Sequence, residues 1–69
     1  MMIKFENNNK NPNELHDYLI NNCTPISLNH NAFYNEEGIK TKEATEIYIE
    51  IEEEKEQELT DLVNQFMSQ

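Results

Sequence analysis

The chain has no arginine or tryptophan, and it has a single glycine and a single cysteine. Binding to nucleic acid requires clustered Lys or Arg to neutralise phosphates, and here five lysines are scattered along the sequence. Direct binding to nucleic acid is therefore disfavoured, and so is binding to anionic membrane surfaces. One glycine also cannot build a Gly-rich phosphate-binding loop.

The lone cysteine, Cys23, excludes a disulfide framework within the chain. A single free thiol fits the reducing cytoplasm better than a secreted protein. The first residues, MMIKFENNN, lack the apolar core of a signal peptide, and no run of 18 apolar residues occurs. We therefore expect a cytoplasmic protein with no membrane span.

Residues 1–69 are long enough for one small domain with a thin core. Hydrophobic residues make up 36% of the chain. A core of that size leaves little surplus over the conformational entropy lost on folding, so we expect marginal stability or self-association that buries more apolar surface.

Negative charge dominates the composition, with 14 acidic residues against five lysines and a net charge of −9. The charge is unevenly distributed. Residues 1–42 hold four lysines and five acids, a net of −1, whereas residues 43–69 hold one lysine and nine acids, a net of −8. A surface of this kind attracts basic surfaces of other proteins.

Three segments alternate apolar with polar residues, as half-buried strands do. The first is residues 1–6, and the second starts at Ile26 and extends its pattern through Tyr34. In the third, Ile47, Ile49 and Ile51 face one way, and the opposite face holds Glu46, Tyr48, Glu50 and Glu52. Gly38, in the sequence NEEG, predicts a turn with positive φ between the second and third strands.

Two segments have helical periodicity. Asn11, Pro12 and Glu14 form an N-cap, a first-turn proline and a capping-box acid, so a helix is expected to start there and to end near Asn21 or Asn22. Its apolar stripe is Leu15, Leu19 and Cys23. After it, Pro25 favours extended backbone at Thr24. Beyond Glu53 a second apolar arc predicts the other helix, with the residues Leu59, Leu62, Val63 and Phe66.

The expected order is therefore β-α-β-β-α, an α+β fold. We predict a small antiparallel three-stranded sheet with the isoleucine-rich strand at its centre and both helices on one face. In topology alone this resembles a ferredoxin-like unit that lacks its last strand. Such a likeness carries no function.

The residues that could perform chemistry are few. His16, Cys23 and His30 are the only soft metal ligands, and no C-x-x-C or H-x-x-x-H spacing is present, so we expect no metal site and no cofactor.

Glu50 and Glu52 would lie about 6.6 Å apart along one strand face, as in any acidic strand. A catalytic carboxyl group needs a pocket that changes its pKa, and a chain this short can barely enclose one. We therefore expect no enzymatic activity.

The acidic run TEIYIEIEEEKEQELTDL, residues 45–62, has two interpretations. In one, Glu53, Glu54 and Glu56 occupy the first turn of a helix, where carboxylates are favoured, and the remaining acids keep a thin domain soluble. In the other, the acids form a surface that imitates the charge of nucleic acid, and Tyr48 is an aromatic anchor for a lysine- or arginine-rich partner.

From these observations we expect a small acidic protein-binding module. Its most concrete form is a phage- or plasmid-type inhibitor that occupies the basic groove of a nucleic-acid-binding host protein. The expected partner-binding residues are Glu46, Tyr48, Glu50, Glu52, Glu54 and Glu58. The alternative is a homo-oligomeric structural or accessory protein whose sheet edges pair between chains and whose acidic surface serves solubility alone.

Overall fold

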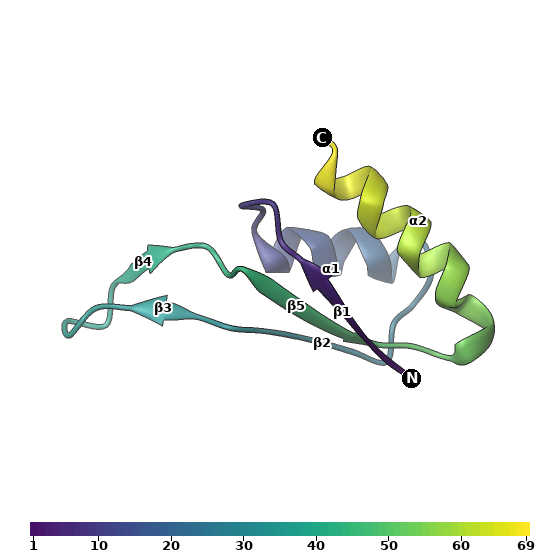
Figure 1. The fold of residues 1–69 in the computed structure, drawn as a ribbon, viewed down its shortest axis with the longest axis horizontal. Helices are drawn as coiled ribbons and strands as arrows, with labels where there is room; N and C mark the ends of the chain where they lie inside the picture. The colour runs from purple at the N-terminus through teal and green to yellow at the C-terminus, as the bar shows by residue number, and fades with distance from the viewer.

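The structure, a computed structural model, describes all of residues 1–69. Its elements are β1 (Met2–Glu6), α1 (Pro12–Ile20), β2 (Ser27–His30), β3 (Phe33–Tyr34), β4 (Lys40–Lys42), β5 (Glu46–Glu50), the short 3₁₀ helix η1 (Glu53–Lys55) and α2 (Glu56–Met67). Figure 1 shows a sheet covered by two helices, with a thin arm of two strands extending from one end.

The main sheet has the order β1-β5-β2, and β5 is antiparallel to both neighbours. In the register, Ile49 of β5 lies between Ile3 of β1 and Leu28 of β2. This confirms the predicted α+β fold with the isoleucine-rich strand at the centre. The last strand in sequence thus separates the first two, which are joined by α1.

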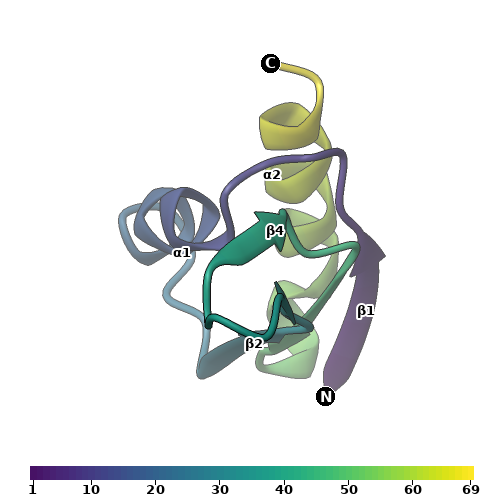
Figure 2. The same cartoon turned by 90° about the vertical axis from the view of Figure 1, so that its left-hand side faces the viewer.

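Both helices pack on one face of this sheet. The fully buried side chains come from α1, from β5 and the residue that follows it, and from α2: Leu15, Leu19, Ile47, Ile49, Ile51, Leu59 and Val63. In Figure 2, turned by 90°, α1 is at the left and α2 is nearer the middle of the view, partly behind β4. Of the predicted apolar stripes, Leu15 and Leu19 of α1 and Leu59, Val63 and Phe66 of α2 are buried. Cys23 is buried too but lies beyond the end of α1, and Leu62 is only half-buried.

The start of α1 follows from its sequence. The Asn11 side-chain oxygen accepts a hydrogen bond from the Asn13 N–H at 2.8 Å, and Pro12 occupies the first turn. At the other end, the N–H groups of Cys23 and Thr24 both donate to the Leu19 carbonyl, at 2.8 and 3.1 Å. These bonds satisfy backbone groups that the helix itself leaves free.

The expectation of an extended Thr24 is wrong, because its φ is +49°. This is the left-handed region, which a β-branched residue rarely adopts. The bond from the Thr24 N–H to Leu19 at the helix end holds the chain in this turn. The tertiary position of β2 decides the conformation here, in place of the local preference set by Pro25.

The predicted second strand is interrupted. It ends at His30 as β2 and resumes at Phe33 as β3, which pairs with β4 in a separate two-stranded sheet. We call residues 31–43 the arm. Every residue from Tyr34 to Lys42 is exposed, so the arm has no core of its own. Gly38 at its tip has a φ of +79°, as the turn prediction required.

Replacing Ile49 with valine tests the core. Ile49 is fully buried at the centre of β5, so Ile49→Val is expected to lower the free energy of unfolding by about 1 kcal/mol, measured by urea denaturation. The matched control is Ile39→Val in the arm, where the side chain is 56% exposed, and we expect little change. Equal losses from the two substitutions would contradict this placement of the core.

Candidate functional site

Three of the predicted partner-binding residues lie on the open face of the sheet, opposite the helices. Glu46, Tyr48 and Glu50 alternate with the buried isoleucines of β5 and are half-buried between neighbouring strands. Across the sheet, Tyr48 lies between Lys4 of β1 and Asn29 of β2. The open face is therefore mixed in character, with one aromatic ring at its centre.

Glu46 is held within this surface. The Tyr48 hydroxyl donates a hydrogen bond to Glu46 Oε2, and Lys4 Nζ lies 3.9 Å from the same oxygen. The pKa of the Tyr48 hydroxyl is raised, first by this hydrogen bond to Glu46. Partial burial of the hydroxyl and the negative charges of Glu46 and Glu6 raise it further. Part of the charge of Glu46 is thus compensated by its own molecule.

The other predicted residues lie where the chain leaves β5 and enters α2. We call residues 52–58 the acidic turn. Its five glutamates are all exposed: Glu52, Glu53, Glu54, Glu56 and Glu58. The turn lies at the end of the molecule opposite the arm (Figure 1).

Lys55 is the only cation in the acidic turn, and it faces inward. It is half-buried, and its Nζ donates to the Cys23 carbonyl at 3.4 Å. The two ion pairs of the structure lie elsewhere, Lys4–Glu46 on the open face and Lys40–Glu43 at the base of the arm. No ion pair therefore neutralises the five glutamates of the acidic turn.

The six predicted residues thus fall into two groups. Glu50 is the last residue of β5 and Glu52 follows two positions later, so these two connect the open face with the acidic turn. Glu58 lies farther along α2 and close enough to Cys23 to affect its thiol. Burial is the main cause that raises the pKa of Cys23, the charge of Glu58 raises it further, and Lys55 opposes both.

The soft ligands are not gathered into a site. α1 ends at Ile20, so His16 and Cys23 do not share a continuous helix, and His30 lies on β2. No group of three or more metal-ligating side chains and no pocket is present. Cys23 is buried, with 4% of its surface exposed.

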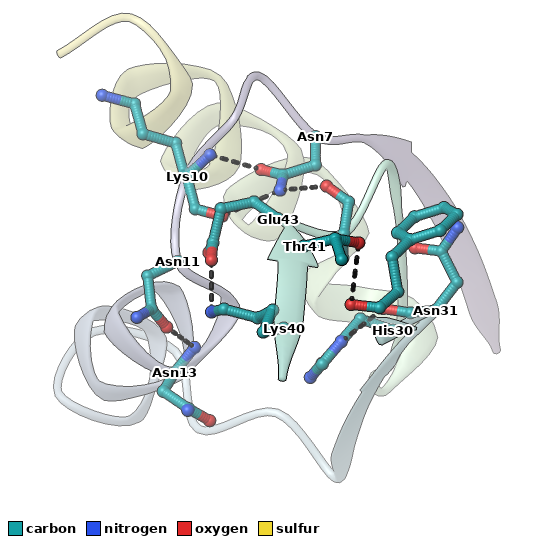
Figure 3. A network of polar contacts seen from close by, with 11 residues as sticks. Asn7, Lys10, Asn11, Asn13, His30, Asn31, Lys40, Thr41 and Glu43 are labelled. Carbon is teal, nitrogen blue, oxygen red and sulfur yellow. Dashed lines mark hydrogen bonds and ion pairs between the residues drawn. The ribbon is translucent and has the colours of Figure 1, made fainter. Parts of the chain in front are cut away.

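Polar contacts gather where the arm meets the body, and Figure 3 shows those of Asn7, of Thr41, of the His30 ring with Asn31 and of the Lys40–Glu43 pair. The Asn31 side-chain oxygen accepts from the N–H groups of Thr45 and Glu46 at 2.9 and 3.1 Å, and its nitrogen donates to the Thr45 hydroxyl at 2.8 Å. Asn7 similarly donates to the carbonyls of Ala44 and Lys10, at 2.6 and 2.8 Å. Sequence reasoning missed both asparagines, because an Asn outside a helix cap or turn has no local signal for such bonds.

No known protein family, curated protein or solved structure matches this chain. Neither helix has the length and apolarity needed to cross a membrane.

The Tyr48–Glu46 hydrogen bond can be tested by titration. Tyr48 is expected to lose its proton at a higher pH than an ordinary tyrosine, measured by ultraviolet absorbance of tyrosinate, and Glu46→Gln is expected to lower that midpoint. The folded state favours the neutral Tyr48 hydroxyl. The stabilisation that its hydrogen bond to Glu46 contributes is therefore fully present below the ordinary tyrosine pKa, and it is lost as the pH rises through the raised pKa of Tyr48 in the folded protein.

Tyr48→Phe identifies which of the three tyrosine transitions belongs to this residue. As a control, Glu36→Gln in the arm removes one charge without touching the pair, and it should leave the Tyr48 midpoint in place. A Tyr48 midpoint that is the same with and without the Glu46 carboxylate would show that the bond does not persist in solution.

Proposed function

We propose that this chain is a cytoplasmic protein-binding module that places its acidic turn in the basic groove of a nucleic-acid-binding protein. By occupying the groove it excludes the nucleic acid. The concrete form of the proposal is an inhibitor of the kind that phages or plasmids encode against host nucleases or transcription proteins.

The observation that supports this proposal is the density of unpaired charge in the acidic turn. Three residue steps in a 3₁₀ helix and three in an α-helix span about 10 Å, so the four intervals between the five glutamates average about 2.5 Å. Duplex DNA presents about one charge per 1.7 Å of its axis. The acidic turn therefore approaches, without reaching, the linear charge density of the ligand that a basic groove binds.

The open face contributes little unpaired charge, and its main contribution is the fixed aromatic ring of Tyr48. Glu50 extends the acidic turn onto the sheet, whereas Glu46 is already paired with Tyr48 and Lys4. Tyr48 is fixed by the same hydrogen bond, so its ring is pre-organised for contact with a Lys or Arg of the partner. In this arrangement the acidic turn steers the partner and Tyr48 marks the edge of the contact.

The test begins with affinity capture from the organism that encodes the chain, followed by direct binding of the purified partner. The variant E52Q/E54Q/E56Q/E58Q removes four charges from the acidic turn. Its affinity is expected to fall by at least about tenfold, because complementary charge at the contact is lost. Raising the salt concentration should weaken wild-type binding in the same direction.

The matched control is E14Q/D17N/E36Q/E37Q, which removes four exposed acids from α1 and the arm. Both variants have the same net charge, so a control that loses as much affinity would show that only total charge matters. Thermal melting verifies that each variant is folded, since carboxylates in the first turn also stabilise α2. Simultaneous binding of nucleic acid and this chain to the partner would overturn the proposal.

A further inference from the structure

Residues 18–35 contain no Asp, Glu, Lys or Arg, although charged residues make up 28% of the chain. In the structure this uncharged stretch includes the end of α1 and all of β2 and β3. We infer that the outer edge formed by residues 26–34, which we call the neutral edge, pairs antiparallel with the same edge of a second copy. The inference is independent of the basic partner proposed above.

The neutral edge is open along its length. β2 is an edge strand of the main sheet, and β3 continues it and pairs only with β4 (Figure 1). Between the pairs His30–Ile47 and Phe33–Lys42, the edge advances by three residues and its inner partner by five. The extra residues thus lie on the inner strand, and the second register shift, between Phe33 and Tyr34, adds another residue on the same inner strand.

Between Asn31 and Asn35 the backbone N–H groups of this edge alternate between inward and outward directions. The Asn31 N–H donates inward to the Glu46 carbonyl at 3.4 Å, and the Asn35 N–H donates inward to the Ile39 carbonyl at 3.0 Å. Because neighbouring residues of a strand direct their N–H and C=O groups to opposite sides, the even-numbered residues between them face away from the sheet. An incoming strand would therefore find outward donors and acceptors at Ala32 and Tyr34, whereas at the other end of the edge the Ile26 N–H is already bonded to the Glu50 carbonyl at 2.8 Å.

The other sheet edges carry the charges that usually prevent such pairing. β1 has Lys4 and Glu6, and β4 has Lys40 and Lys42. Charged side chains on edge strands discourage edge-to-edge association, and the neutral edge has none. The contrast favours one closed pair of chains over an open polymer.

A second copy fits this edge better than a charged partner does. Two molecules with a net charge of −9 repel each other, and the neutral edge is where they can approach without placing charge against charge. Glu50 lies opposite Ser27, so the acidic turn is at the Ile26 end of the edge. In an antiparallel pair the two acidic turns would lie at opposite ends of the dimer.

The exposed apolar side chains specify the register. A two-fold axis at His30 places His30 opposite His30 of the second copy. Residues equally far before and after this position then pair across the axis, so Ile26 lies opposite Tyr34 of the second copy. These are the most exposed large hydrophobic residues of the chain, at 63% and 61%. The two-fold axis repeats this Ile26–Tyr34 contact, so it occurs twice in the dimer. A C₂ dimer of this type uses the same surface on each copy.

Cysteine cross-linking tests the register. In a Cys23→Ala background, His30→Cys would place two thiols across the axis, in a pair with a Cα–Cα distance of about 5.5 Å, which a disulfide can span. Lys4→Cys on the edge of β1 is the matched control. Under mild oxidation, His30→Cys is expected to form the disulfide dimer at least about tenfold faster, because pairing raises the local thiol concentration. Equal rates would overturn the proposed register.

Sedimentation tests the dimer itself. Ala32→Pro removes an outward N–H, and His30→Lys puts two like charges across the axis, so each is expected to convert the dimer to monomer. Asn13→Lys on α1 adds the same charge elsewhere and should leave the dimer intact. Higher salt should strengthen self-association by screening repulsion, which is the opposite of its effect on a basic partner.

A wild-type chain that stays monomeric in high salt at about 1 mM would overturn the inference, since its dissociation constant would then be weaker than about 1 mM. If Ala32→Pro fails to fold, His30→Lys decides the question. Either result leaves the binding test of the acidic turn unaffected, because that test measures a different partner.

Discussion

The strand β5 is the constraint on which the molecule depends. It lies between β1 and β2, and its odd-numbered isoleucines supply the sheet side of the only core. Because side chains alternate along a strand, burial of Ile47, Ile49 and Ile51 forces Glu46, Tyr48 and Glu50 onto the other face. A slip of one residue would bury carboxylates without partners, which is far more costly than any surface gain. The register of the sheet and the composition of its open face therefore have one cause.

The acidic turn begins where this alternation ends. After Ile51 the chain turns into η1 and α2, and carboxylates in the first helical turn are stabilised by about 0.3–1 kcal/mol each through the exposed N–H groups. That effect fades within one turn, so it accounts for Glu53 and Glu54 at the start of η1 and for Glu56 and Glu58 at the start of α2. The repulsion among five exposed glutamates is not relieved by any ion pair, since Lys55 faces the Cys23 carbonyl. The first turns of η1 and α2 therefore explain where these charges gather, and their mutual repulsion is left for solvent or a basic partner to relieve.

The sequence predicts the parts of this fold that depend on side-chain period and caps. The alternation at Ile47–Ile51 and the Asn11–Pro12 helix start are local signals, and both hold in the structure. The arm was not predictable in the same way, because Lys40–Lys42 has no buried face. It contacts β3 through the backbone, through the Thr41 hydroxyl on the Phe33 carbonyl and through the Lys42 ammonium over the Phe33 ring, none of which has a local signal. The positive φ of Thr24 and the bonds of Asn31 likewise depend on where distant segments meet.

For the candidate site, charge and strand parity placed Glu46, Tyr48 and Glu50 on one face, but they did not show that Tyr48 and Lys4 hold Glu46. A surface that copies one continuous stretch of nucleic acid would need the acidic turns of two copies to lie side by side. Pairing through the neutral edge places them at opposite ends instead, so a dimer would offer two separate acidic contacts. Such a molecule would gain affinity for a partner with two basic sites through effective concentration, and each site would need only one acidic turn.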